Sequence, residues 1–298
     1  MRTSAIGWTD HSGGDLNMVT GCTPVSRGCD HCYGRAIYER FGRDYGTVTC
    51  HEDKLERLWR ARFSEFSPKR GAPHRPMAFL CDTGDLFHEE VPETFVARVF
   101  ALMLRRPHVT WQVLTKRPAR MRDLLGNSRS FWMLLGAWND RLGGGPIIWP
   151  ADYVWLGVSV EDQATADERV PLLLDTLAAV RFVSVEPMLG PVDLRWSIHT
   201  SRCSACGQWW DYNPIYCTNC SGHGVTVDRQ PVLDWVVAGF ESGLNRRPGD
   251  ERWALDLREQ CREAGVPFFG KQTSGLRPGV PLLLDGVTVH EWPGEKRK

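Results

Sequence analysis

The chain has 298 residues, enough to bury a substantial core as one large α/β domain or two small ones. Lysine plus arginine equals aspartate plus glutamate at 36 each, which excludes a general electrostatic attraction to nucleic acid or membranes but not a local basic groove. No apolar run approaches the ~18 residues of a membrane span, and the N-terminus lacks the apolar core of a secretory signal, so we expect a cytoplasmic protein without membrane contact.

Short β-branched or aromatic runs recur along the chain, and helix-like patterns follow most of them. The first run, residues 16–19, precedes three clustered cysteines and a helix-like stretch at 35–41. Further strands are expected at 77–83, 108–118, 152–162, 180–191, 233–243 and 266–272, and helices at 93–104, 119–142, 167–179 and 253–264. Seven strand–helix units predict an α/β fold with a parallel sheet, curled into a partial or full (β/α) barrel.

Polar side chains gather directly after the expected strands, where the carboxyl ends of a barrel's strands form one mouth. A single acidic residue there is usually a helix cap, but six polar strand ends in one chain favour a functional site. The residues are Thr83, Gly84 and Asp85; Thr115, Lys116 and Arg117; Ser159, Glu161 and Asp162; Ser184 and Glu186; Glu241 and Ser242; and Lys271 and Gln272.

Three cysteines, Cys22, Cys29 and Cys32, lie within the run GCTPVSRGCDHCYGRAIYERF. A [4Fe–4S] cluster held by three thiolates keeps one iron free for a substrate or cofactor. The alternatives are a zinc site completed by His31, His11 or Cys50, or three buried thiols. The position of these cysteines on a loop between a strand and a helix favours the cluster.

A second constellation interrupts the strand–helix rhythm. Two C-x2-C knuckles separated by ten residues are typical of a closed, structural zinc site, and an auxiliary [4Fe–4S] cluster is the alternative. We therefore expect a barrel over residues 1–194 and 233–273, a metal-binding insertion over 195–232 and a C-terminal tail over 274–298. The four cysteines are Cys203, Cys206, Cys217 and Cys220, while Cys50, Cys81 and Cys261 are expected to be small buried hydrophobes.

The cysteine loop and the barrel together resemble the radical S-adenosylmethionine (SAM) superfamily. That superfamily carries three cysteines after the first strand of a partial (β/α)6 barrel, with the common spacing C-x3-C-x2-C; this chain has six residues in the first gap and His31 where an aromatic residue is usual. The strings VTGCTPVSRGCDHCY, DLFHEEVP, LTKRPARM, LGVSVED, SVEPMLGPVDL, VVAGFESG and CREAGVPFFGKQ also resemble a phage and prophage three-cysteine family of unknown function, regarded as radical-SAM-like, over about residues 7–273.

The superfamily resemblance implies roles for particular strand-end residues. Thr83, Gly84 and Asp85 occupy the position of the motif that binds the methionine amino group of SAM, and Lys116 or Arg117 would meet its carboxylate. Ser159 and Glu161 match positions that bind the ribose or the carboxylate. Glu241 ends a stretch, 238–241, that loosely matches the adenine contact, and Glu186 is assigned to the site by its strand-end position.

The same resemblance implies an iron–sulfur enzyme that reductively cleaves SAM to a 5′-deoxyadenosyl radical, with a reductant such as flavodoxin or ferredoxin. The phage and prophage family implies this fold and cofactor without a defined substrate. Its phage context makes a nucleotide or nucleic-acid base the expected substrate, and implies expression from a phage or prophage in a bacterial cytoplasm and a partner protein encoded nearby. Thirteen tryptophans and a basic loop at 116–122 (Lys116, Arg117, Arg120 and Arg122) are compatible with a nucleic-acid substrate. The alternative is a non-catalytic, zinc-stabilised nucleic-acid-binding phage protein, without redox chemistry.

Overall fold

The computed structural model describes residues 1–69, 75–198, 201–202, 209–210 and 232–294. All four cysteines of the expected metal-binding insertion lie outside these ranges, so the zinc prediction for Cys203, Cys206, Cys217 and Cys220 stays a prediction. Within the insertion, β7 (Ser201–Arg202) and β8 (Trp209–Trp210) pair antiparallel.

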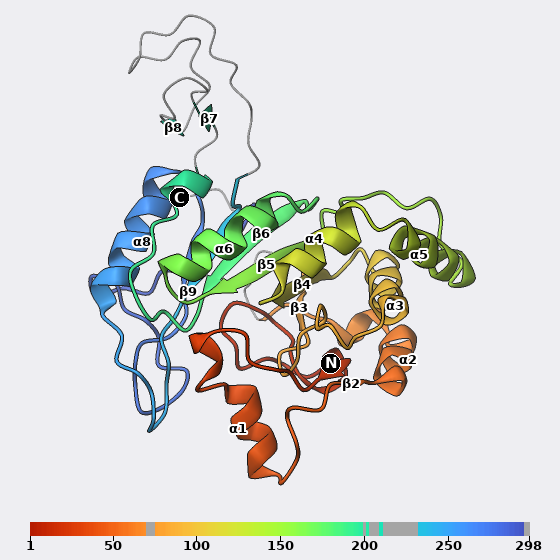
Figure 1. Cartoon of the computed structure of the whole chain (residues 1–298), viewed down its shortest axis with the longest axis horizontal. Helices are drawn as coiled ribbons and strands as arrows, with labels where there is room; N and C mark the ends of the chain where they lie inside the picture. Colours follow the sequence, from red (N-terminus) through yellow and green to blue (C-terminus); the bar gives the residue numbers. More distant parts are fainter. Residues whose placement is uncertain (70–74, 199–200, 203–208, 211–231, 295–298) are drawn as a thin grey trace, which may run out of the picture.

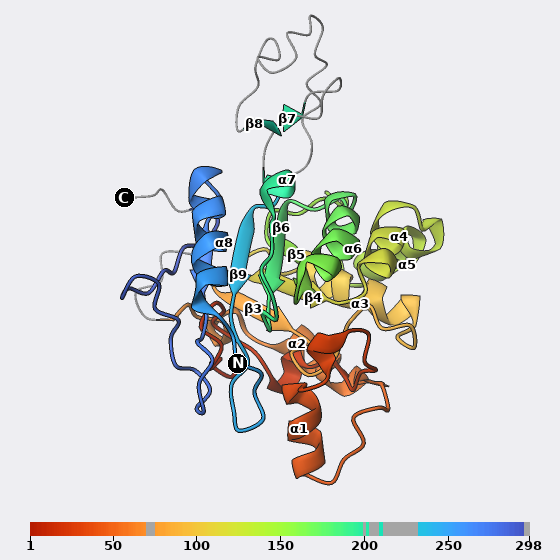
Figure 2. The same ribbon diagram turned by 60° about the vertical axis from the view of Figure 1, so that its left-hand side comes forward.

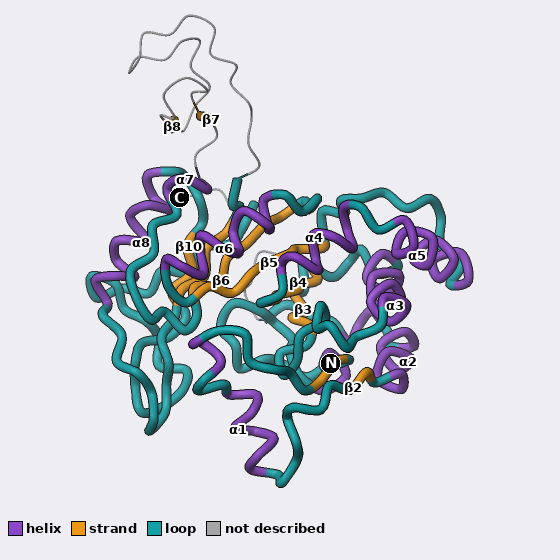
Figure 3. The backbone as a smooth tube through the Cα atoms, viewed as in Figure 1, coloured by secondary structure: helices purple, strands orange, loops and turns teal. Residues whose placement is uncertain are grey.

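The centre of the molecule is one parallel sheet of six strands, in the order β10-β9-β6-β5-β4-β3 (Figures 1 and 3). Every residue of β3, β4 and β5 is buried or nearly so, as expected of parallel strands covered on both faces. The sheet curls into a half-barrel, compatible with a partial (β/α) barrel. The strands are β3 (Met77–Leu80), β4 (Thr110–Thr115), β5 (Val154–Val160), β6 (Val180–Val185), β9 (Trp235–Ala238) and β10 (Phe268–Gly270).

Helices pack along the outer face of this sheet and connect its strands (Figure 2). Three of them begin at residues whose side chains accept a backbone N–H of the first turn: Ser128 caps α5, Asp162 caps α6 and Asp250 caps α8. These helices are α3 (Glu93–Leu104), α4 (Pro118–Gly126), α5 (Arg129–Arg141), α6 (Gln163–Leu174), α7 (Arg195–Ile198) and α8 (Glu251–Glu263). A further helix, α2 (Glu52–Arg60), precedes β3 and packs against a 3-10 turn at Gly14–Leu16. None of the described helices is long and apolar enough to cross a membrane.

Six of the seven expected strands are confirmed, and the first is wrong. Residues 16–19 do not join the sheet; β1 (Val19–Thr20) instead pairs antiparallel with β2 (Thr49–Cys50). The reason is local, because Gly13 and Gly14 have positive φ and lead into a 3-10 turn at Gly14–Leu16 that breaks an extended strand. Single bridges, His11 to Ala78 and Gly21 to Gly84, still hold this segment parallel to β3.

The two faces of the sheet have different cores, because successive strand residues point to opposite faces. The outer face contributes aliphatic residues to the main core beneath the helices. The inner, concave face carries a mainly aromatic cluster of buried residues, which we call the inner aromatic cluster. It consists of Trp8, Met77, Phe79, Trp155, Phe182, Trp235, Val237 and Phe269. Trp8 comes from the N-terminal segment and contacts the rings of Phe79, Phe182 and Trp235, so it fills the half-barrel from its open side.

The inner cluster generates a stability prediction at Gly157 of β5. A Cβ atom at this position would lie 2.5 Å from the ring of Phe182, which is fully buried. We expect Gly157→Ala to lower the free energy of unfolding by about 1–3 kcal/mol in urea titrations, since the ring has no space to retreat. Gly136→Ala in α5, where nothing lies within 4 Å, is the matched control and should be neutral or stabilising by up to about 1 kcal/mol. Equal midpoints for the two variants would contradict this packing.

Candidate functional site

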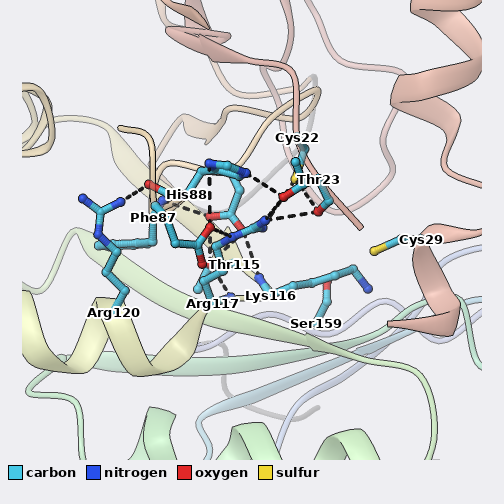
Figure 4. Close-up of polar contacts among 12 residues, drawn as sticks. Cys22, Thr23, Cys29, Phe87, His88, Thr115, Lys116, Arg117, Arg120 and Ser159 are labelled. Atoms are coloured by element: carbon cyan, nitrogen blue, oxygen red, sulfur yellow. Dashed lines mark hydrogen bonds and ion pairs between the residues drawn. The ribbon is translucent and has the colours of Figure 1, made fainter. Parts of the chain in front are cut away.

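A cavity of about 150 Å³ lies at the carboxyl ends of β3, β4 and β5, with the inner aromatic cluster beneath it. Its lining brings the three clustered cysteines together with strand-end residues, as the sequence predicted for Gly84, Asp85, Lys116 and Ser159. Figure 4 shows Cys22 and Cys29 beside Lys116, Arg117 and Ser159. We call it the cysteine cavity. The lining residues are Cys22, Thr23, Pro24, Val25, Cys29, Cys32, Tyr33, Arg35, Tyr45, Phe79, Cys81, Asp82, Gly84, Asp85, Leu114, Thr115, Lys116, Arg117 and Ser159.

The cysteine loop runs from β1 to helix α1 (Tyr33–Arg40), which begins directly after Cys32. Gly21 starts the loop with a φ of 82°, and a Cβ there would lie 2.1 Å from the Thr47 carbonyl oxygen. Its N–H donates to the Thr83 carbonyl (3.1 Å), which is how Thr83, itself outside the cavity lining, holds the loop against β3. The loop therefore approaches two backbone segments so closely that only glycine fits.

Arg117 at the end of β4 joins the cysteine loop to two other loops (Figure 4). Its Nη1 donates to the Cys22 sulfur (3.4 Å) and to Asp85 (3.3 Å), and its Nη2 donates to the hydroxyl (2.9 Å) and carbonyl (3.1 Å) of Thr23. Its Nε donates to Glu89 at 2.8 Å. Burial alone would lower the pKa of Arg117, but Asp85, Glu89 and Cys22 raise it, so the guanidinium stays charged.

Asp85 is buried and its oxygens already accept from the protein's own donors. Thr115 Oγ1 lies 2.7 and 2.9 Å from its two oxygens, and the backbone N–H groups of Phe87 (2.9 Å) and Lys116 (3.1 Å) complete the shell with Arg117. A carboxylate engaged in this way has little capacity for an incoming amino group. The geometry favours Asp85 as the residue that orients Arg117; its predicted contact with SAM stays a prediction.

Glu161, at the end of β5, ties the cysteine loop from a second side. This carboxylate is 1% exposed and forms ion pairs with Lys116 and Arg169, and it accepts from Ser26 Oγ at 2.9 Å. Gly28 leaves the space it occupies, since a Cβ there would lie 2.4 Å from Glu161. Glu161 and Lys116 thus pair with each other, where the sequence predicted two ligand-binding groups.

Glu241, after β9, holds the same loop from a third side. Its carboxylate accepts from the backbone N–H of Arg247 (2.7 Å), from the Arg247 guanidinium and from His31 Nδ1 (3.0 Å). Arg247 in turn donates to the Arg27 carbonyl at 2.9 Å and pairs with Asp30 at 3.4 Å. Burial alone would raise the pKa of Glu241, but these donors lower it. Glu186 pairs with Lys271 at 2.5 Å.

The basic loop after β4 is committed to internal contacts. Lys116 and Arg117 are paired as described, Arg120 donates to the carbonyls of His88 and Val91, and Arg122 pairs with Asp123. Three of the thirteen tryptophans, Trp8, Trp111 and Trp235, are no more than 2% exposed and belong to the core. These three tryptophans and the paired arginines and lysine of the loop are therefore not free to contact nucleic acid.

The thiols surround the cavity and do not meet at a point. Among the described residues, no three His, Cys, Asp or Glu side chains are placed to hold a single metal ion. His11 is occupied by backbone groups of Arg2 and Ser67, and His31 by Glu241, so neither completes a zinc site with the cysteines. Three cysteines around one cavity suit an iron–sulfur cluster, in which each cysteine ligates a different iron.

Two features of the cavity were not predicted from the sequence. Cys81, expected to be a small buried hydrophobe, has a positive φ of 57° and contributes a fourth thiol to the lining. Burial raises its pKa to about 12. His88, whose Nε2 lies 2.8 Å from Thr23 Oγ1, supports the loop from beneath. A strained non-glycine backbone at a cavity is the signal that marks Cys81, and it is visible only in the structure.

A test of the Cys22 environment uses metal-free protein. Burial raises the pKa of Cys22 to about 11, while Arg117 opposes the shift. Because only the thiolate reacts, alkylation of Cys22 by iodoacetamide should keep accelerating up to about pH 11, well above the ~8.5 of a reference cysteine peptide. Arg117→Gln should move the profile to still higher pH. Peptide mass spectrometry measures the rates, and a Cys22 profile that levels off near pH 9 would contradict the burial.

The contacts that Arg247 makes with Glu241 and with the cysteine loop, which we call the Arg247 clamp, are tested by hydrogen exchange. Arg247→Met removes the donors that bind Glu241 and the Arg27 carbonyl, so amides of residues 27–32 should exchange about ten-fold faster or more. Arg246→Met is the control, because its side chain donates to the Gly243 carbonyl within its own loop. Unchanged exchange in the Arg247 variant would show that the clamp does not hold the cysteine loop.

Comparisons with known proteins place the chain in a family. Among curated proteins, none matches it. A solved structure, "Spore photoproduct lyase complexed with dinucleoside spore photoproduct", is similar to 58% of this chain and to 45% of its own chain, with 12% sequence identity and a TM-score of 0.37. The chain therefore spans less than half the length of that protein, and no conclusion rests on the similarity. A family profile matches residues 3–280, nearly the whole chain, and the chain therefore belongs to the family described as "Protein of unknown function (DUF5131)".

Proposed function

We propose that this protein is a radical SAM-like iron–sulfur enzyme. The observation that carries the proposal is that Cys22, Cys29 and Cys32 line one cavity together with the polar ends of three parallel strands. A structural zinc site would need its ligands around a single ion, and the described residues offer no such group.

Cys22, Cys29 and Cys32 are the residues that would hold a [4Fe–4S] cluster. Such a cluster, when bound, supplies the electron that reductively cleaves SAM to a 5′-deoxyadenosyl radical. Arg117 would hold Cys22 in place and donate to its sulfur, and hydrogen bonds to ligand sulfurs raise cluster potentials. The aromatic floor, including Phe79, excludes water from beneath the cavity.

The loop that carries the cysteines is held on three sides, which is what a precisely positioned ligand set requires. Arg117 fixes Cys22 and Thr23, Glu161 fixes Ser26, and Arg247 fixes Arg27 and Asp30. Contacts from three sides to the eleven-residue stretch 22–32 would keep the thiols in place before the cofactor binds.

The substrate and partners belong to the same proposal. A nucleotide or nucleic-acid base is the proposed substrate, and the electron would come from a flavodoxin or ferredoxin in the cytoplasm. Zinc in the four-cysteine insertion and a phage or prophage origin remain predictions from the sequence.

The proposal is tested by metal analysis of anaerobically purified protein. We expect a brown sample absorbing near about 400 nm, with about four irons and four sulfides per chain at the cysteine cavity and one zinc in the insertion; about eight irons would mean a second cluster. Cys29→Ala should remove the colour and the iron of the cavity. Cys50→Ala, outside the cavity lining, is the control and should keep both.

Cys81→Ala separates an open cluster from a closed one. If three cysteines suffice, the variant keeps its iron and cleaves SAM as the wild type does. Loss of iron in Cys81→Ala would make Cys81 the fourth ligand and contradict a site kept open for SAM. A colourless wild-type protein containing zinc alone would contradict the proposal as a whole.

A further inference from the structure

We propose that Arg35 is the oxyanion-binding residue of the cysteine cavity, taking a carboxylate or a phosphate group of the ligand. Arg35 lies on α1, three residues after Cys32, and lines the cavity together with Cys22, Cys29 and Cys32. The superfamily resemblance implies this role for Lys116 or Arg117 instead.

Those two cations are already neutralised. Lys116 forms an ion pair with the buried Glu161, and Arg117 forms ion pairs with Asp85 and Glu89. An incoming anion would have to displace a buried carboxylate from either of them, which leaves an uncompensated charge behind. Neither is therefore suited to bind the ligand.

Arg35, in contrast to Lys116 and Arg117, has no acidic partner among the described residues. Its Nε is buried without a hydrogen-bond partner, and no ion pair or side-chain hydrogen bond of Arg35 occurs within the described ranges. Buried charged donors are almost always satisfied in folded proteins, so an unsatisfied one in a cavity indicates a missing acceptor. The guanidinium presents a planar fork of donors that matches carboxylate and phosphate oxygens.

The acidic residues of the cavity do not compensate Arg35. Asp85 is saturated by Thr115, Arg117 and backbone donors, and Asp82 Oδ1 accepts from Asn17 at 2.6 Å. The first turn of α1 also favours an anionic ligand near Arg35. Its backbone N–H groups are free, because Cys32 at the N-cap provides no side-chain acceptor for them. Arg35 is thus the cation of the lining that forms no ion pair with a described acidic residue and can bind an anionic ligand.

The oxyanion has two chemical sources. One is the carboxylate of SAM, and this arm rests on the proposed function. The other is the phosphate of a nucleotide substrate, and this arm does not require a cluster. Each source has a probe pair that differs mainly in the charged group: SAM against decarboxylated SAM, and thymidine 5′-monophosphate against thymidine.

The test measures binding of these four probes by calorimetry to the anaerobically purified full chain. Arg35→Gln should weaken binding of either SAM or thymidine 5′-monophosphate by about ten- to one-hundred-fold, the usual effect of losing a charged hydrogen bond. Binding of the member of that pair that lacks the anionic group should be unchanged. Arg35→Lys should lose less. Arg40→Gln, an exposed arginine on the same helix outside the lining, is the charge-matched control and should bind as the wild type does.

A loss confined to SAM assigns the carboxylate, and a loss confined to the monophosphate assigns the phosphate. Equal affinities of wild type and Arg35→Gln for all probes would overturn the proposal, as would a wild type that does not distinguish the members of either pair. Because Arg35 donates no hydrogen bond to described residues, the thermal transition of Arg35→Gln should match that of Arg40→Gln. Iron content, measured on the same samples, reports separately on the proposed function.

Discussion

One guanidinium links the barrel to the loop that gives the cavity its thiols. Arg117 stands after β4, is oriented by Asp85 from the loop after β3, and donates to the sulfur of Cys22 and to both oxygens of Thr23. The Gly21 N–H and the hydrogen bond between Thr23 and His88 add two further contacts to the segment after β3. A buried arginine is suited to this task because it stays charged and offers several donors in a fixed geometry.

The half-barrel explains why the cavity lies where it does. Its concave face is filled by aromatic residues up to Phe79, and beyond that level the strands present Cys81, Leu114 and Ser159. Trp8 from the N-terminal segment fills the interior beside Phe79, and the cysteine cavity lies above this level, at the carboxyl ends of the strands. Stability and chemistry are therefore separated along the strand direction, as is usual in βα barrels.

Much of the fold could be predicted from the sequence, because buried parallel strands appear as β-branched runs such as 154–160 and 180–185, and polar residues mark their ends. The first strand could not, because a pair of glycines with positive φ, Gly13 and Gly14, outweighs the apolar run that follows. The grouping of Cys22, Cys29 and Cys32 around one cavity was predictable from their position on a strand-to-helix loop.

The functional roles of charged residues were less predictable, because they depend on pairing between distant segments. In the sequence, Lys116 and Glu161 each look like a ligand-binding group. In the structure they form an ion pair with each other, although they lie 45 residues apart in the chain. Arg35 looks like a solvated helix residue, and its importance emerges only when the other cations are seen to be paired. Cys81 resembles a core residue in the sequence, because the residues around it do not predict the positive φ that directs its side chain toward the cavity.

The central claim is that three thiols hold a cluster whose fourth iron is left open. Electron paramagnetic resonance of the reduced protein, recorded with and without SAM, tests this most directly. The account predicts a [4Fe–4S] signal whose g values change when SAM is added, because the cofactor binds the open iron. A cluster signal that SAM leaves unchanged, or a reduced protein with no cluster signal, would contradict it.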